Sequence, residues 1–267
     1  MPEPAPAAPG PPEAGVWDRY VAEYHDATPG ITEDVLADAS DVEGRSPYQW
    51  LVEAVPAGAS IIVDLACGSA PVARLLGAAR VVGVDQSAGE LARARATGPP
   101  GPLVRARAAA LPIAGGRADA VVASMALMLL CPLEAVLAEV RRLLRPGGTF
   151  AATVPLRSGA PGPAPAPAFA EILDALGQAA TNYPEGHDDG TPAERFSAAD
   201  LTLLGDDVRL FSRVVHGPDD AELVVRSMYA PGAGRARVNA AVAGFQRRVR
   251  AAPVRVDYRV RRLVARR

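Results

Sequence analysis

Residues 63–71 read VDLACGSAP, and this stretch indicates the fold class. An apolar run meets an acid, Asp64, and continues through a turn of small residues into a helix that begins near Pro71. Small residues let a ligand approach the backbone closely, and the first turn of a helix presents N–H groups that have no partner within the helix. The stretch therefore predicts a strand, a ligand-binding turn and a helix, in this order.

Short apolar runs and helical stretches alternate on both sides of this turn. The predicted strands are 61–65, 81–84, 103–104, 120–123 and 149–154. The predicted helices between them are 71–77, 89–97 and 133–144. Such alternation predicts an α/β fold, in which helices cover both faces of a parallel sheet.

The chain is predicted to divide into three parts. Residues 1–15 are rich in Pro and Ala and aperiodic, which is typical of a disordered tail. Residues 16–56 contain three predicted helices and form an N-terminal helical cap, in which Thr32 is expected to cap a helix at 32–41. Residues 57–267 form the main domain, with a lid segment at about 156–205 and a further helix predicted at 197–204.

The composition excludes several classes of protein. Hydrophobic residues make up 49% of the 267 residues and charged residues 22%, so the chain is neither disordered throughout nor collagen-like. No run approaches the ~18 apolar residues of a membrane helix, and the two cysteines make no disulfide framework. We therefore expect a cytoplasmic protein without a membrane partner. No cluster of His, Asp and Glu has the spacing of a metal site, so no metal is expected.

A second acid, Asp85, ends the next predicted strand. A carboxylate at this place can accept hydrogen bonds from both hydroxyls of a ribose. A dinucleotide site would want the spacing G-x-G-x-x-G for its pyrophosphate, but the turn after Asp64 has only Gly68. The two acids together predict a ligand that contains a nucleoside and lacks a pyrophosphate.

Four motifs in order resemble the class I S-adenosylmethionine-dependent methyltransferases. They are DLACGSA at 64–70, VVGVDQS at 81–87, ALPIAGGRADAVVAS at 110–124 and LAEVRRLLRPGGTF at 137–150. The resemblance covers about residues 61–154 and is specific because the order and spacing agree as well. It implies a doubly wound, mostly parallel seven-stranded Rossmann-like sheet with an N-terminal helical cap, and S-adenosylmethionine as the cofactor.

The resemblance also implies which residues hold the methionine part of the cofactor. Ala66 and Gly68 would contact it through the backbone, and Asp64 would orient its amino group. Ser124 and Met125, just past the fourth predicted strand, would approach the methionine end from the other side.

For the nucleoside part, the resemblance implies that Asp85 binds the ribose and that Gln86 lies near the adenine. The backbone of Ala108 and Ala109 would meet the adenine edge. Arg107 departs from the family pattern, because many relatives have an acid at this place and an arginine cannot accept a hydrogen bond.

The sequence also suggests what the acceptor site contains. Residues 125–132 are almost wholly apolar, where many relatives carry a histidine and an acid, and this favours a hydrophobic acceptor. His25 is the candidate base or acceptor-positioning group and is expected in a loop before Pro29, with His187 of the lid as a weaker candidate. The prediction is methyl transfer to a small hydrophobic metabolite of secondary metabolism, with the methylated atom and the oligomeric state left open.

Three alternatives stay open: an RNA methyltransferase, a nicotinamide-dependent reductase and a cofactor-binding protein without catalysis. The first is suggested by residues 234–267, which contain eleven arginines and a single acid, Asp257. In this segment, however, apolar residues alternate with charged ones at 254–261, as in a half-buried strand, and recur at helical spacing at 238–249. The basic end is therefore predicted to be a solvated face, and nucleic acid is not the expected partner.

Overall fold

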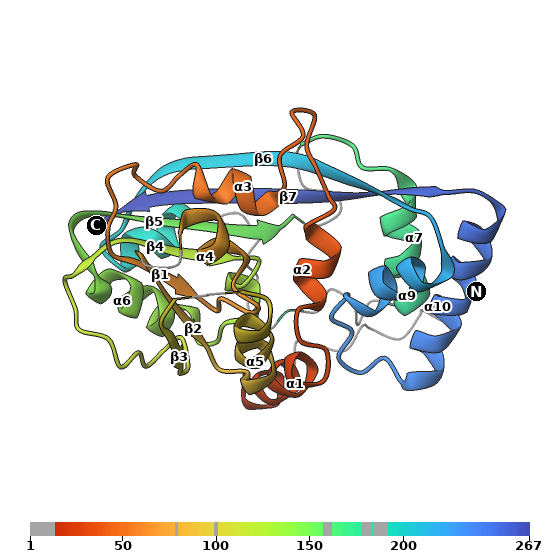
Figure 1. Cartoon of the computed structure of the whole chain (residues 1–267), viewed down its shortest axis with the longest axis horizontal. Helices are drawn as coiled ribbons and strands as arrows, with labels where there is room; N and C mark the ends of the chain where they lie inside the picture. Colours follow the sequence, from red (N-terminus) through yellow and green to blue (C-terminus); the bar gives the residue numbers. More distant parts are fainter. Residues whose placement is uncertain (1–13, 78–79, 99–100, 157–161, 178–182, 184–191) are drawn as a thin grey trace, which may run out of the picture.

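One seven-stranded sheet runs through the part of the chain that the structure describes. The computed structural model describes residues 14–77, 80–98, 101–156, 162–177, 183 and 192–267. The strands lie in the order β3-β2-β1-β4-β5-β7-β6 (Figure 1). Their bounds are β1 Ile62–Leu65, β2 Val81–Asp85, β3 Leu103–Arg105, β4 Ala118–Ser124, β5 Leu144–Pro155, β6 Thr202–Val215 and β7 Val254–Arg266. Only β7 runs antiparallel to its neighbours, β5 and β6, so the predicted mostly parallel seven-stranded sheet is confirmed.

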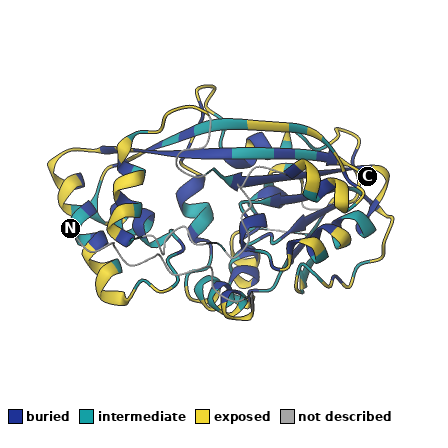
Figure 2. Cartoon of the chain, turned by 180° about the vertical axis from the view of Figure 1, so that it is seen from behind, coloured by how far each residue is buried: buried dark blue, intermediate teal, exposed yellow. Residues whose placement is uncertain are grey.

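Helices cover both faces of this sheet. One apolar core lies under α2, α3, α4, α7, α9 and α10, and a second core lies under α6 and α8 on the opposite face. The helix bounds are α1 Ala14–Ala27, α2 Ile31–Leu36, α3 Pro47–Val52, α4 Pro71–Leu76, α5 Ala88–Ala96, α6 Leu133–Leu143, α7 Pro167–Leu176, α8 Pro192–Ala198, α9 Pro218–Arg226 and α10 Arg235–Ala251. Figure 2 shows the burial that results, with dark blue strands inside and yellow outer sides on the helices.

Side chains of the central strands enter the two cores in turn, because successive residues of a strand point to opposite faces. In β1, Ile62 packs into the first core, and Val63 and Leu65 pack into the second. All three are at most 1% exposed, as expected for a parallel strand that is covered on both faces. Because β1, β2 and β4 are parallel, their carboxyl ends lie at one edge of the sheet. The strand order reverses there, and open α/β sheets bind ligands at such a place.

β6 and β7 are much longer than the parallel strands and extend beyond them (Figure 1). They pair over their full length, from Thr202 opposite Arg266 to Val215 opposite Val254. Their far ends pack against α7, α9 and α10, and these helices form a second lobe beside the carboxyl ends of the parallel strands. This lobe supplies residues to the site described below.

Two predicted helices differ from the structure. The helix predicted at 197–204 is wrong, because α8 ends at Ala198 and the chain enters β6 at Thr202, where pairing with β7 overrides the local pattern. The helix predicted at 32–41 begins and ends early. Gly30, not Thr32, is its N-cap, and the chain leaves α2 after Leu36. It then pairs Ser40 with Ser212 on the open edge of β6, which protects that edge.

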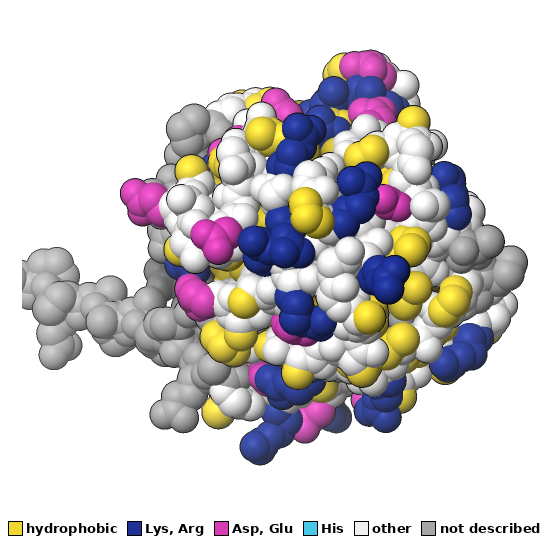
Figure 3. All heavy atoms as spheres, turned by 90° about the vertical axis from the view of Figure 1, so that its left-hand side faces the viewer, with side chains coloured by type: hydrophobic (Ala, Val, Ile, Leu, Met, Phe, Trp, Pro, Cys, Tyr) yellow, Lys and Arg dark blue, Asp and Glu magenta, His cyan; other side chains and the backbone are white. Residues whose placement is uncertain are grey.

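Several arginines of the basic end pair with acids from other parts of the chain. Arg248 of α10 contacts Glu171 of α7, and Arg261 of β7 forms an ion pair with Asp206 of β6 at 2.6 Å. On the face that carries the C-terminus, arginines are scattered with single acids between them (Figure 3). These contacts support a structural role for the basic end. Among the described residues, no helix combines the length and the apolar character needed to cross a membrane.

Candidate active site

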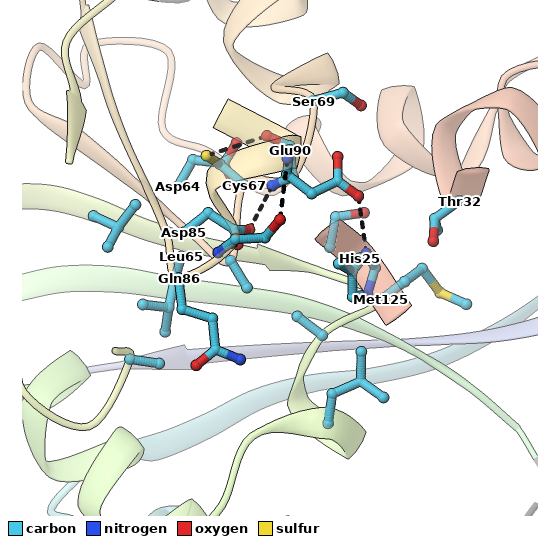
Figure 4. A pocket seen from close by; sticks show the side chains of 18 of the residues that line it. His25, Thr32, Asp64, Leu65, Cys67, Ser69, Asp85, Gln86, Glu90 and Met125 are labelled. Atoms are coloured by element: carbon cyan, nitrogen blue, oxygen red, sulfur yellow. Dashed lines mark hydrogen bonds and ion pairs between the residues drawn. The ribbon is translucent and has the colours of Figure 1, made fainter. Parts of the chain in front are cut away.

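A pocket of about 880 Å³ lies at the carboxyl ends of β1, β2 and β4. Its floor is the turn from Leu65 to Ser69, and its sides include the strand-end residues Asp85 and Ser124 (Figure 4). Helix α1 covers it from outside, held by a hydrogen bond of 3.0 Å from the indole N–H of Trp17 to the Leu129 carbonyl.

Asp85 ties the two ligand-binding turns together. The Gly68 amide donates to Asp85 Oδ2 at 2.8 Å, and the Ser87 amide donates to Oδ1, also at 2.8 Å. Burial raises the pKa of this carboxyl, and the two N–H donors oppose the shift. Each oxygen keeps acceptor capacity on the pocket side, because a carboxylate oxygen accepts about two hydrogen bonds.

Asp64 is the least satisfied polar group of the pocket. Its side chain is 1% exposed, and neither carboxyl oxygen has a hydrogen-bond partner among the described residues. Burial, with a smaller contribution from the charge of Asp85, raises the pKa of Asp64 to about 8. The hydroxyl of Ser124 opposite it is also buried without a partner. Buried polar groups are normally hydrogen-bonded, so this end of the pocket suits a ligand that brings donors.

Left-handed backbone conformations gather around these groups. Ala66 has φ 52°, Ala70 has φ 65° and Met125 has φ 51°, and Asp200 is the one further non-glycine residue with a positive φ in the described part of the chain. Such conformations cost of order 1–3 kcal/mol for residues with a Cβ and cluster at functional sites. They turn the chain sharply after β1 and β4, and so bring backbone groups to the pocket.

The structure brings almost all of the predicted cofactor residues to this one pocket. Eight of them line it: Asp64, Ala66, Gly68, Asp85, Gln86, Ala108, Ser124 and Met125. Ala109 is not among the lining residues and packs instead against the apolar core that includes α6. Arg107 pairs with Asp18 of α1, and so helps to hold the covering helix rather than a ligand.

His25 lies in the last turn of α1, not in a loop, and lines the pocket. Its Nδ1 is 2.8 Å from Oε1 of Glu90, and its Nε2 is 2.9 Å from the hydroxyl of Tyr229. Glu90 is 2% exposed, and its Oε2 accepts a hydrogen bond of 2.9 Å from the Gly30 amide. His187 lies outside the described residues.

The sequence did not single out Glu90 or Tyr229. Glu90 follows Ser87, the N-cap of α5, and has the ordinary signature of an acid in the first turn of a helix. Tyr229 follows α9 and is separated from His25 by 204 positions. No local signal links residues so far apart.

A second pocket, of about 790 Å³, adjoins the first. The two share Thr32, Met125 and Tyr229, and none of the described residues that line the second pocket is charged. The remaining lining residues are Val35, Leu36, Met128, Pro155, Leu156, Phe169, Leu173, Tyr183, Ser227, Met228 and Tyr258. The hydroxyl of Tyr258 is buried without a hydrogen-bond partner among the described residues, and burial raises its pKa.

Only some of the apolar residues at 125–132, which were expected at the acceptor site, line this second pocket. Met125 and Met128 line it. Leu127 is buried in the core beside α6, and Leu129 lines the first pocket.

Sequence comparisons match the centre of the chain. Residues 63–152 match the family model described as a methyltransferase domain. An uncharacterized methyltransferase of Synechocystis sp. is 38% identical over 94 residues, which are 34% of this chain and 44% of that protein. The match therefore spans less than half the length of this curated relative.

Comparisons of structure extend over the flanks. The [4+2]-cyclase SpnF superposes with a TM-score of 0.62 at 18% identity, covering 97% of this chain and 99% of that one. A candidate type II methyltransferase from Anaeromyxobacter dehalogenans superposes with a TM-score of 0.58 at 23% identity, covering 82% of this chain and 94% of that one. At such identities these likenesses show the fold. Residues 63–152 are thus matched as a methyltransferase domain, and the chain around them has the fold of these structures.

Proposed function

We propose that this protein transfers a methyl group from S-adenosylmethionine to a small, neutral and largely apolar acceptor. The observation that carries the proposal is the buried Asp64 carboxyl, which has no partner among the described residues and lies in the pocket at the strand ends. The cofactor's α-ammonium group would supply the missing donors. The second pocket, whose described lining residues are all uncharged, then offers a place for the acceptor beside it.

The described residues fit the other parts of the cofactor as well. Asp85 would accept hydrogen bonds from the ribose hydroxyls, and the strained turn at Ala66 and Gly68 would bring backbone groups to the methionine part. Gln86 and Ala108 would lie against the adenine. When bound, S-adenosylmethionine supplies an electrophilic methyl group on a sulfonium. The chain's own task is to hold the acceptor in line with it, and such alignment contributes up to ~7–11 kcal/mol.

Calorimetry with S-adenosylmethionine, S-adenosylhomocysteine and NAD tests cofactor choice. We expect micromolar dissociation constants for the first two, on the order of −8 kcal/mol, and much weaker binding of NAD, since the turn lacks the glycines that a pyrophosphate needs. Tight binding of NAD without binding of S-adenosylmethionine would contradict the proposal and favour a reductase.

Replacing Asp85 with Ala should weaken the binding of S-adenosylhomocysteine about 10- to 150-fold. The change removes charge-assisted hydrogen bonds of ~1.5–3 kcal/mol and releases the Gly68 and Ser87 amides that shape the turns. Calorimetry measures the effect, with Asp174→Ala on the exposed side of α7 as the control. An unchanged dissociation constant would show that Asp85 serves only the backbone turns.

A second candidate function is a reaction without methyl transfer in the same pockets. It is suggested by the full-length likeness to SpnF, a [4+2]-cyclase. Incubation with cofactor carrying an isotope-labelled methyl group and with host metabolite extracts separates the two. A labelled product of higher mass supports methyl transfer, and we expect the acceptor to be an apolar product of secondary metabolism. Conversion of a metabolite without incorporation of label supports a reaction without methyl transfer.

A further inference from the structure

Three side chains form a hydrogen-bonded chain from the core to the junction of the two pockets. Glu90 of α5 contacts His25 Nδ1 at 2.8 Å, and His25 Nε2 contacts the hydroxyl of Tyr229 at 2.9 Å (Figure 4 shows the first of these). Tyr229 is 7% exposed and lines both pockets. This series of hydrogen bonds thus ends where an acceptor would meet the cofactor.

Glu90, the buried end of this series, sets the direction of the hydrogen bonds. A carboxylate only accepts hydrogen bonds, and the second oxygen of Glu90 accepts one from the Gly30 amide. His25 in the neutral form therefore donates from Nδ1 to Glu90 and presents the lone pair of Nε2 to Tyr229. The hydroxyl of Tyr229 then donates to His25, and its oxygen is left to accept.

The oxygen of Tyr229 has room for one more donor. The Thr32 side chain lies near the phenol and also lines both pockets. Among the described residues, His25 is the hydrogen-bond partner of the phenol, so the phenol oxygen can still accept a hydrogen bond from a ligand. Among the described residues that line the second pocket, no charged side chain competes for that place.

We propose that the acceptor is a neutral molecule with a hydroxyl group on an apolar body, and that this hydroxyl donates to Tyr229; the inference rests on the proposed methyl transfer. During the reaction the acceptor O–H bond breaks and its proton passes to Tyr229, while the Tyr229 proton passes to Nε2 of His25. The acceptor oxygen forms the new C–O bond as the methyl C–S bond breaks, and that electron pair stays on sulfur. Glu90 stabilises the imidazolium, which later releases one proton to water.

Tyr229 is the residue that touches the acceptor, and His25 and Glu90 are positioning residues that act through it. The unpartnered hydroxyl of Tyr258 adds a donor at another point of the second pocket, suited to an ether or carbonyl oxygen on the acceptor body. An acceptor with one hydroxyl and a second oxygen would satisfy both sites.

The first test is the tautomer of His25 in the protein bound to S-adenosylhomocysteine. The chain has three histidines, so nitrogen-15 NMR of the imidazoles is simple to read, and His25→Gln identifies the signal. At pH 8 we expect a neutral ring with the proton on Nδ1. A proton on Nε2, or on both nitrogens, would make Tyr229 an acceptor from His25 and would overturn the proposal.

The second test is binding of two ring compounds of similar size, 2-naphthol and 2-methylnaphthalene, to the same complex. The preference for 2-naphthol over 2-methylnaphthalene should fall about tenfold in Tyr229→Phe, the equivalent of one hydrogen bond. It should stay unchanged in Tyr24→Phe, since Tyr24 bonds to the Arg226 carbonyl and lines neither pocket. An unchanged preference in Tyr229→Phe, a tenfold loss in Tyr258→Phe instead, or no binding of 2-naphthol overturns the proposal.

Failure of the proposed function can be distinguished from failure of this inference. Binding of S-adenosylhomocysteine is measured in every sample. Its absence from the wild-type protein contradicts the proposed function itself. Normal binding with the wrong tautomer or an unchanged preference leaves the proposed function standing and removes only the role given to Tyr229.

Discussion

Replacing Asp64 with Asn should weaken the binding of S-adenosylmethionine and, in the ligand-free protein, raise stability at pH 8. The first effect follows from the loss of a charge-assisted contact with the ammonium group, ~1.5–3 kcal/mol or about 10- to 150-fold in affinity. The second follows from burial, because the pKa of Asp64 in the folded protein is about 8 and its ordinary value is 3.8. The folded state holds a proton that the unfolded state loses above pH ~4.

The sign of the pH dependence follows from that difference. The contribution of Asp64 to stability is complete below its unfolded pKa and is lost as the pH rises towards about 8, by up to ~1.4 kcal/mol for each pH unit. Urea unfolding of the ligand-free protein at pH 5, 6, 7 and 8 measures the free energy of unfolding. This free energy should fall less steeply with pH in Asp64→Asn than in the wild-type protein. Affinity for S-adenosylmethionine should rise with pH between 5.5 and 7.5 in the wild-type protein only, since the carboxylate form binds the cation.

Asp119→Asn is the matched control for this pair of effects. Asp119 lies at the opposite end of the sheet, where an ion pair with Arg145 and the Ser60 and Ile61 amides hold its pKa well below the usual range. The contribution of Asp119 to stability is lost only as the pH falls below ~4. In Asp119→Asn, the change of the unfolding free energy between pH 5 and 8 and the affinity for S-adenosylmethionine should therefore stay as in the wild-type protein. Equal slopes in wild-type and Asp64→Asn would refute a protonated Asp64.

Shortening the chain after residue 253 should abolish the native fold. The change deletes β7, which pairs with β5 from Thr149 to Pro155 and with β6 along its whole length. It also removes Val256 and Val260, both 0% exposed, from the core under α7, α9 and α10. Unpaired strand edges and exposed apolar surface lead to aggregation. We expect no cooperative thermal transition by circular dichroism and aggregates in gel filtration.

A charge control separates this structural role from binding of nucleic acid. Arg247 and Arg250 are exposed on α10, and replacing both with Ala should leave the protein folded. Fluorescence anisotropy with a single-stranded RNA oligonucleotide should show no binding that depends on these residues. RNA binding by the wild-type protein that falls steeply with salt and is lost in the double variant would favour an RNA acceptor over an apolar metabolite. A protein shortened after residue 253 that keeps its fold would also favour an RNA acceptor.

The central strands and the cofactor pocket were predictable because their signals are local. Strand 61–65 and the turn that follows it carry their apolar pattern and small residues within about ten positions. Parallel strands place their carboxyl ends at one edge, so Asp64 and Asp85 had to come together once the strands were recognised. Ala109 shows the limit of this reasoning, because the orientation of a loop residue depends on what packs behind it.

The extent of β6 and the second lobe depended on contacts between distant segments. Residues 197–204 carry a pattern compatible with a helix or a strand, and pairing with β7, about sixty positions later, selects the strand. The early end of α2 likewise follows from the pairing of Ser40 with Ser212. Such pairings are absent from any local window of sequence.

The sequence by itself determined the parallel half of the sheet, the turn at residues 64–71 and the acid at Asp85, since apolar periodicity and turn chemistry act over a few residues. Only the tertiary structure decided that His25 lies between Glu90 and Tyr229, and that uncharged residues gather around the second pocket in the part of the chain that the structure describes. These residues are brought together by packing across 65 and 204 positions of chain. The energy of such contacts depends on the whole fold, and no neighbouring residue encodes it.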